Sequence, residues 1–537
     1  MGDTLRADVV IVGAGVAGTM AGYWLARAGA KVIILESGPR IDRAEAVETF
    51  RRALVKIPES PFPRSAAAPA PNSLEPNGYY VQEGPELFKS TYQRLVGGTT
   101  WHWLGTAIRL LPEDFRMRAL YGVGVDWPIP YAELDPWYAA AEAEMGVAGK
   151  EDLGSPRSTP WPMPPIPLSY SDLRIAEAIA DLGYVVTTTA QARNSVPYDG
   201  RAPCCGANSC IPICPIDARY DGSMHVRKAE MAGVRIVDGA IAHFIDIGPD
   251  GRVTRIRFKR PDNTEHEASS QVYVLAAHGI ETPKLLLASK SAALPDGVAN
   301  ASGQVGRNLM DHPVQLSWAL ARDPLGQPRG PLSTAGIDAT RRRADRDRQS
   351  AFRVEFGNDG WRWPVGGPEV IAADMVKKGL RGEPLAHALA HHSTRQIRLS
   401  SLAEQLPDPE NRIVPAFDKL DALGIPRPRL SYRIDAYTRD GMAASRALHD
   451  RIFDALGATF REHKEEPQGA GHVMGTYRMG TDPRTSVVDA ELRAHDHENL
   501  FMLGSGVFPT AGTANPTLTI AALALRAAAA IARNLGR

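Results

Sequence analysis

This chain lacks net charge: its 537 residues include 61 basic and 61 acidic side chains. A balanced chain has no electrostatic footprint for nucleic acid or for an acidic membrane surface, so neither kind of partner is expected. The one basic run, Arg341–Arg348, contains two aspartates. That mixture predicts a solvated loop or helix face.

Long apolar runs are absent as well. No window reaches the ~18 uncharged apolar residues that a membrane-spanning helix needs. The most apolar stretch, Thr517–Ala532, is interrupted by Arg526 and predicts a buried C-terminal helix. After Met1 the chain soon enters a strand at Ala7–Gly13, so no signal peptide is expected. By itself the chain predicts a soluble protein, unless a folded partner carries it across a membrane.

Cysteine is scarce, and its placement is informative. The four cysteines, Cys204, Cys205, Cys210 and Cys214, lie in one segment, and Pro215 follows the last of them. An iron–sulfur cluster needs several thiolates that converge on a small core, and a tight loop of cysteines supplies them. Adjacent side chains project in different directions, so Cys204 and Cys205 are not both expected to bind one cluster. We favour Cys204, Cys210 and Cys214 as the ligands, with Cys205 as the alternative.

Three other interpretations of the cysteines stay open. Four thiolates could form a zinc site, because metal softness alone does not exclude it. Two disulfides in so tight a loop are sterically awkward. Inert buried thiols are the third alternative, and iron analysis distinguishes all three from a cluster.

A complete β–α–β unit opens the chain. Its first strand leads through a turn with Gly13, Gly15 and Gly18 into a helix over Gly18–Gly29, and a second strand ends at Glu36. The first glycine allows the turn, the second lets the backbone approach a pyrophosphate, and the third permits close helix–strand contact. Glu36 is placed to accept hydrogen bonds from an adenosine ribose. The motif alone leaves FAD and NAD as alternatives.

The rest of the chain predicts a discontinuous architecture. Strand periods recur over 232–260 with a turn at Pro249–Gly251, and Gln271–Ser289 has the pattern of a strand, a tight turn and a helix. Between about 313 and 464 the composition changes to Arg/Asp-rich loops with scattered strands. We therefore expect a nucleotide-binding domain from 1–312 and 465–537, which carries the cysteine loop at 200–220. A second domain, 313–464, is inserted into it.

Six segments, in this order, resemble the glucose–methanol–choline (GMC) family of FAD oxidoreductases over nearly the whole chain. They are the N-terminal glycine fingerprint, Val96–Trp103, Ala276–Ser289, Gly306–Pro313, Gly471–Gly480 and Phe508–Arg526. The resemblance implies an α/β fold (α+β overall). A Rossmann-like FAD-binding domain would carry an inserted substrate domain built on an antiparallel sheet.

Within that family, the cysteine loop resembles the large catalytic subunits of bacterial membrane-associated sugar dehydrogenases. The resemblance implies FAD, a [3Fe-4S] cluster, a small subunit with a twin-arginine signal and a multihaem cytochrome c or other acceptor. It also implies a periplasmic enzyme that reaches the membrane only through its partners. Oxidation of glucose at C1 is the first expectation. Glucoside 3-, gluconate and fructose dehydrogenases, an oxygen-using oxidase and a non-enzymatic redox scaffold are the alternatives.

By motif position, the resemblance assigns the catalytic pair to His472 and Asn515. Removing a hydride from a carbinol carbon requires a base for the hydroxyl proton, and an imidazole with a pKa of about 6.5 serves at neutral pH. An amide can orient the hydroxyl but cannot act as the base, so His472 is expected to be the base and Asn515 the positioning group.

Further residues are expected near the flavin. Backbone N–H groups of the Gly97–Thr100 turn could meet the pyrophosphate or the ring system, and His102 stands where some relatives bind FAD covalently. Where many relatives have an aspartate near the ribityl chain, this chain has Gly504 followed by Ser505. The full set of predicted cofactor-binding residues is Gly13, Gly15, Gly18, Glu36, Gly97, Gly98, Thr99, Thr100, His102, Gly504, Ser505 and Thr517. His312, in the motif Met310–Pro313, is expected to be structural.

Overall fold

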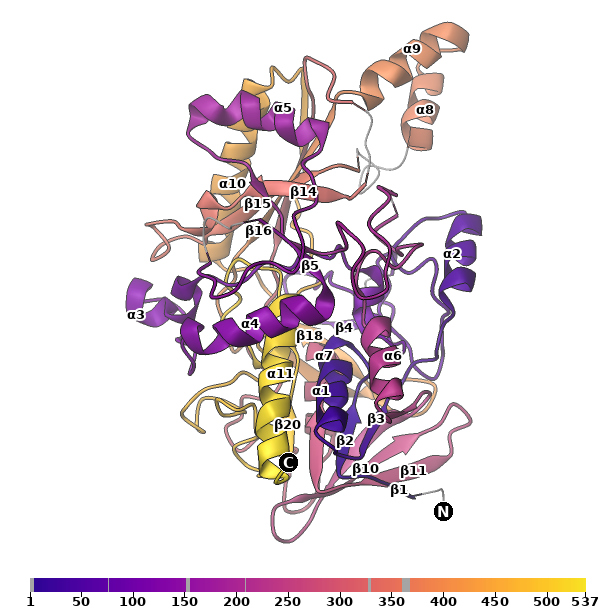
Figure 1. The fold of residues 1–537 in the computed structure, drawn as a ribbon, viewed down its shortest axis with the longest axis vertical. Helices are drawn as coiled ribbons and strands as arrows, with labels where there is room; N and C mark the ends of the chain where they lie inside the picture. Colours follow the sequence, from indigo (N-terminus) through magenta and orange to yellow (C-terminus); the bar gives the residue numbers. More distant parts are fainter. Residues whose placement is uncertain (1–3, 76, 151–154, 208, 327–329, 360–367) are drawn as a thin grey trace.

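A computed structural model describes residues 4–75, 77–150, 155–207, 209–326, 330–359 and 368–537 (Figure 1). At its centre is a five-stranded sheet in the order β20-β12-β2-β3-β8, in which every neighbouring pair is parallel. Its strands are rich in Val, Ile and Leu because both faces are covered. Their bounds are β2 Val9–Val12, β3 Val32–Leu35, β8 Arg235–Val237, β12 Val272–Leu275 and β20 Leu500–Met502.

Helices pack closely on this sheet because small residues face the contacts. Helix α1 (Val16–Arg27) follows β2, and a Cβ at Gly18 would lie 2.0 Å from the Gly13 carbonyl oxygen. The C-terminal helix α11 (Thr517–Asn534) contacts α1 and α4 (Tyr131–Met145), while α6 (Ser223–Met231) contacts α1. Helices α11, α1 and α6 lie side by side in Figure 1, and α4 runs across the upper end of α11. Together with the sheet they form the largest core.

A second sheet has six strands in the order β19-β13-β16-β15-β14-β6, and its pairs are antiparallel. Helix α10 (Ala436–Ala455) covers it, capped at its start by the Asp435 carboxylate, which accepts from the Thr438 N–H at 2.8 Å. The strands are β6 Thr187–Thr188, β13 Val314–Leu320, β14 Ser333–Ile337, β15 Phe352–Gly357, β16 Gln396–Ala403 and β19 Phe460–His463.

The remaining elements surround these two sheets. A four-stranded sheet contains β1 Thr4–Arg6, β9 Ile241–Ile247, β10 Val253–Lys259 and β11 Glu265–Ser269; a three-stranded sheet contains β4 Val81–Gln82, β17 Arg412–Leu420 and β18 Pro426–Ser431; β5 Val147–Ala148 pairs with β7 Gln191–Ala192. The other helices are α2 Arg43–Arg52, α3 Met117–Tyr121, α5 Tyr170–Ile179, α7 His278–Ala288, α8 Pro368–Lys377 and α9 Gly382–Ser393. Short 3-10 turns connect several of them, and helices α8 and α9 stand apart from the sheets (Figure 1).

The predicted mixed α/β fold is confirmed, and the first helix begins two residues earlier than the sequence suggested. The predicted C-terminal helix is present and largely buried. Among the described residues, no helix combines the length and apolarity needed to cross a bilayer. The boundaries of the inserted domain, 313–464, stay a prediction. Strand β6 lies outside that range in the sequence but joins the six-stranded sheet.

The predicted exposure of the basic run Arg341–Arg348 is wrong for two of its arginines and confirmed for Arg342 and Arg348. Arg341 and Arg346 are fully buried rather than solvated. Arg346 lies 2.7 Å from both Asp114 and Glu404, which supply the negative charge that permits its burial. The sequence pattern showed the run's own aspartates but not these distant carboxylates.

Candidate functional site: a cavity between the two large sheets

One cavity of about 480 Å³ extends from the carboxyl edge of the parallel sheet to the six-stranded sheet. Ligands bind at this edge in open parallel sheets. The predicted residues that line it are Gly13, Gly15, Glu36, Gly98, Thr99, Thr100, His102, His472, Gly504, Ser505, Asn515 and Thr517. Gly18 and Gly97 are the predicted cofactor-binding residues that are not among the lining residues.

The nucleotide end of the cavity is formed by the first β–α–β unit. Gly13 has a φ of +105°, and a Cβ there would lie 2.4 Å from the Ala276 carbonyl oxygen. Helix α1 begins without a side-chain cap, so its first N–H groups remain available to an anion. Glu36 accepts from the N–H groups of Ala14 at 2.7 Å and Gly38 at 2.8 Å, and burial raises its pKa.

A second glycine turn closes over the first. A Cβ at Gly98 would lie 2.8 Å from the Gly15 Cα, so the two turns can touch only with a glycine at position 98. The His102 side chain lines the cavity beyond this turn, and its buried Nδ1 has no hydrogen-bond partner. Burial, with Arg219 and His278 nearby, lowers its pKa to about 4, so the ring is neutral. The glycine cradle and the unpaired nitrogen both fit FAD.

The predicted catalytic pair, His472 and Asn515, meets at the other end of the cavity. The Asn515 Nδ2 lies 3.4 Å from the His472 Nε2, although the two residues are far apart in sequence. On its far side the His472 Nδ1 lies 2.8 Å from the Nδ1 of the buried His312. The Asp311 carboxylate accepts hydrogen bonds from two backbone N–H groups, that of His472 at 3.0 Å and that of His312 at 2.7 Å. Burial raises the pKa of Asp311 to about 6.

These contacts determine which nitrogen of His472 carries the proton. The His312 Nε2 lies 2.9 Å from the Gly512 carbonyl oxygen, which can only accept, so that nitrogen is the donor. Burial lowers the pKa of His312 to about 4, and in its neutral ring Nδ1 must then accept. The His472 Nδ1 therefore donates, which leaves a lone pair on its Nε2, beside Asn515. Burial and His312 hold the pKa of His472 well below its usual 6.5.

Sequence reasoning missed this use of His312. The residue was expected to be structural, and its neighbour Asp311 was not considered. His278 was missed too: it lines the cavity with a φ of +74° and stacks on Tyr92 at 4.4 Å between ring centroids. A signal was available, because both histidines lie inside the motifs that carried the family resemblance.

The wall opposite the nucleotide turns is formed by polar side chains of the six-stranded sheet. Glu355 on β15, Arg398 and Ser400 on β16, and Asp359 line it. The charges are paired: Arg398 lies 2.8 Å from Asp359, and Arg353 lies 3.0 Å from Glu355. Such a wall offers donors and acceptors to hydroxyl groups without presenting a free charge.

The cysteine loop lies beside this cavity, which Ile211 and Pro212 of the loop help to line. No disulfide joins any of the four cysteines. Cys210 and Cys214 are buried, Cys204 is half-buried and Cys205 is exposed. Across the described ranges, no three His, Cys, Asp or Glu side chains are gathered into a metal-binding group.

A buried positive charge nevertheless lies near three of the thiols. The buried Arg193 guanidinium interacts electrostatically with Cys210, Cys204 and Cys214, and these interactions raise its pKa against the effect of burial. Its Nη1 lies 3.8 Å from the Cys204 Sγ. Positive charge without a carboxylate partner fits an anionic, thiolate-bound group at this loop.

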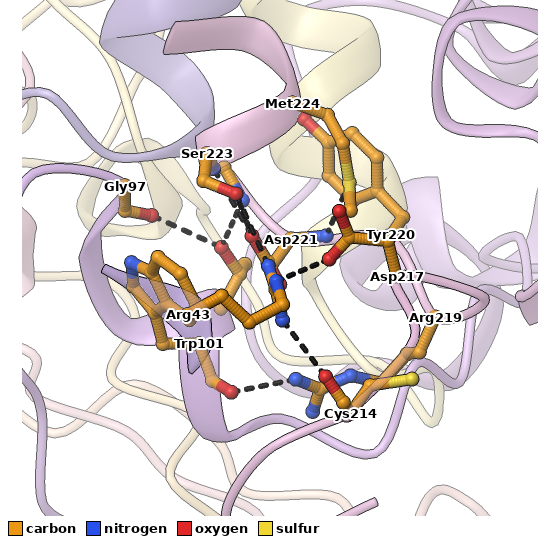
Figure 2. A network of polar contacts seen from close by, with 12 residues as sticks. Arg43, Gly97, Trp101, Cys214, Asp217, Arg219, Tyr220, Asp221, Ser223 and Met224 are labelled. Carbon is orange, nitrogen blue, oxygen red and sulfur yellow. Dashed lines mark hydrogen bonds and ion pairs between the residues drawn. The ribbon is translucent and has the colours of Figure 1, made fainter. Parts of the chain in front are cut away.

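A polar network joins the cysteine loop to the segment that contains Gly97 and Trp101 (Figure 2). Arg43 donates to the Cys214 carbonyl oxygen at 3.0 Å and to the Asp221 carboxylate at 2.7 Å, and its guanidinium lies over the Trp101 ring at 4.3 Å. Arg219 donates to the Trp101 carbonyl oxygen at 2.6 Å. The cysteine loop is thus held against the segment that lines the cavity at His102.

Comparisons with known proteins agree with this geometry. Models of the GMC oxidoreductase family match residues 165–314 and 407–524, and an FAD binding domain model matches 8–47. The chain is 39% identical to the fructose dehydrogenase large subunit of Gluconobacter japonicus over 99% of each chain. It is 30% identical to the 6'''-hydroxyparomomycin C oxidase of Streptomyces lividus over 98% of this chain and 92% of that one. A formate oxidase of Aspergillus oryzae shares the fold at a TM-score of 0.65 and 15% identity, with 99% of both chains covered.

Proposed function

Because the chain belongs to the GMC oxidoreductase family, we propose that it is the FAD-dependent catalytic subunit of a sugar dehydrogenase. The observation that carries the proposal is the His472–Asn515 pair in the same cavity as the dinucleotide turns. FAD, when bound, supplies the hydride acceptor. The family and the glycine cradle support FAD as the cofactor.

The chain's own residues supply the acid–base chemistry. The His472 Nε2 takes the proton of the substrate hydroxyl while the C–H hydride leaves, so the product is a neutral carbonyl. The Asn515 amide holds the hydroxyl so that its C–H bond is directed at the acceptor. As His472 becomes an imidazolium, its Nδ1–H bond to His312 strengthens, because hydrogen bonds to charged groups are the stronger ones.

The substrate we propose is a neutral sugar. Within the described part of the wall, the cations that face the substrate space are paired, Arg398 with Asp359 and Lys89 with Glu466. A sugar acid such as gluconate would bring a carboxylate to a wall whose described residues include no free cation on the substrate side. Glucose at C1, the expectation from sequence, stands beside fructose, which the similarity to a fructose dehydrogenase large subunit supports.

For the electrons we propose an exit through the cysteine loop. A [3Fe-4S] cluster on Cys204, Cys210 and Cys214 would take them singly from the flavin, and a multihaem cytochrome c or other acceptor would follow. The positive charge of Arg193 near these three thiols supports the ligand set. Cys205, which is exposed, is the thiol left over.

We also propose partner subunits. The relative from Gluconobacter japonicus is called a large subunit, which supports a complex for this chain. A small subunit with a twin-arginine signal would carry the folded chain to the periplasm. Co-purification of the two gene products, and loss of periplasmic activity without the small subunit, would test this.

The test of the proposed function is anaerobic bleaching of bound FAD by a sugar panel. Fructose or glucose should bleach the flavin, and gluconate should not. If no neutral sugar reduces the flavin, the proposal fails. If gluconate is the best reductant, the neutral-wall argument fails while the dehydrogenase assignment stands.

A GMC oxidase is the second candidate, favoured by the similarity to the 6'''-hydroxyparomomycin C oxidase. An oxidase would return the electrons to oxygen and release peroxide. Admitting air to the sugar-reduced protein separates the two. Slow reoxidation by air with rapid reoxidation by a one-electron dye supports the dehydrogenase, and stoichiometric peroxide supports the oxidase.

A further inference from the structure

Among the described residues, six arginines are fully buried: Arg109, Arg193, Arg219, Arg341, Arg346 and Arg353. Four of them have a carboxylate within salt-bridge distance. Arg109 pairs with Glu142, Arg341 and Arg353 pair with Asp338, and Arg346 pairs with Asp114 and Glu404. Arg193 and Arg219 are the two fully buried arginines with no such partner among the described residues. Both lie at the cysteine loop.

Hydrogen bonds satisfy most of their N–H groups but not their charge. Arg193 donates to the Gln191 side-chain oxygen and the Leu104 carbonyl, both at 2.9 Å, and to the Cys204 sulfur at 3.8 Å. Arg219 donates to the carbonyl oxygens of Cys210, Trp101 and Trp103. Its Nε is buried with no partner.

Arg193 and Arg219 are also neighbours in space, because their backbone segments pair with each other. Arg193 and Arg219 face each other in an isolated antiparallel bridge, so two like charges are buried side by side. An uncompensated buried charge destabilises a protein strongly, and a second one nearby adds repulsion. The cysteine loop lies against both arginines: the Cys204 Sγ is 3.8 Å from Arg193, and the Cys210 carbonyl oxygen accepts from Arg219 at 2.8 Å. Asp221 is the acidic group that acts most on Arg219, ahead of Cys214 and Cys210, but its carboxylate is paired with Arg43 at 2.7 Å.

We propose that Arg193 and Arg219 are positioning residues that balance the negative charge of the thiolate-bound iron–sulfur cluster and raise its reduction potential. This inference rests on the cluster of the proposed function. Three thiolates make the site anionic, and one-electron reduction adds one more negative charge. Nearby fixed positive charge stabilises the reduced form more than the oxidised form, and does so strongly where water is excluded.

Arg219 also connects the cluster site to the flavin. Its acceptors Trp101 and Trp103 flank His102 in the chain, and its third acceptor is Cys210. One side chain therefore holds the cysteine loop and the cavity-lining turn in fixed relation. A higher reduction potential of the cluster favours electron transfer from the flavin to the cluster.

The test is a redox titration of the purified holoenzyme, followed by electron spin resonance, with iron and FAD content measured on the same samples. Arg193→Gln and Arg219→Gln should each lower the equilibrium constant for cluster reduction at least tenfold, which is about 59 mV for a one-electron couple. Arg193→Lys and Arg219→Lys keep the charge and should shift it less than tenfold. The control is Arg227→Gln, which removes a half-exposed cation from α6 near the loop and should have no effect.

Each outcome of these measurements either supports or overturns the proposed role of the two arginines. Iron lost from the Gln variants but retained in the Lys variants also supports the proposal. An unchanged potential in both Gln variants overturns it and leaves the proposed function intact. If the Gln variants do not fold, the Lys variants carry the test, and a tenfold fall in them overturns the proposal. A wild-type protein without iron overturns both this inference and the proposed electron route.

Discussion

Replacing His312 by Phe should slow flavin reduction while leaving FAD bound. The substitution removes the acceptor of the His472 Nδ1–H, which lies 2.8 Å away in a buried site. An unsatisfied buried donor costs about 1–3 kcal/mol, and His472 avoids that cost by moving its proton to Nε2, where the substrate hydroxyl needs a lone pair. The imidazolium formed in the transition state also loses its hydrogen bond. At about 1.4 kcal/mol per factor of ten, kcat should fall roughly 5- to 150-fold.

The assay is anaerobic stopped-flow reduction of bound FAD over a range of sugar concentrations. The matched control is His312→Gln, whose amide oxygen can still accept from His472 and should recover part of the rate. KM should change little, since His312 does not touch the substrate space. A folded, FAD-replete His312→Phe protein with wild-type kcat would refute the tautomer argument.

The other predictions concern the cluster, the cofactor cradle and pH. Cys205→Ser should keep its iron and Cys214→Ser should lose it; equal iron per chain in both would reject the ligand assignment. Gly18→Ala should lower FAD content and melting temperature, because its Cβ would lie 2.0 Å from the Gly13 carbonyl oxygen; unchanged values would contradict this. His472 is a base only above its folded pKa, which is lowered well below 6.5, and Asp311 beside it has a pKa of about 6, so flavin reduction should be independent of pH from about 7 to 8. An inflection within that range would show otherwise.

Local patterns predicted the parts of the fold that are local. The β2–α1–β3 unit follows from its Val/Ile strands and its glycines, because backbone conformation and close packing there depend on neighbouring residues. The buried C-terminal helix follows in the same way from its small and apolar residues. The positions of Arg341 and Arg346 did not follow, since their partners lie far away in the sequence.

In the candidate site, too, only the residues that belong to local motifs could be predicted from the sequence. Motifs named His472 and Asn515, but only the fold shows that His312 fixes the proton on His472. The cysteine spacing indicated an iron–sulfur loop. It gave no sign of Arg193 and Arg219, which are brought to the thiols by pairing between segments that flank the loop. Long-range contacts of this kind leave no local pattern in a sequence.

The central claim is that His472 takes a proton from a sugar hydroxyl as the hydride reaches FAD. Single-turnover bleaching of FAD by the preferred neutral sugar, in the wild type and in His472→Asn at equal FAD content, tests it most directly. General-base catalysis contributes about 10²–10⁴-fold, so the variant should be slower by that factor. Equal rates of bleaching in the two proteins would contradict the account.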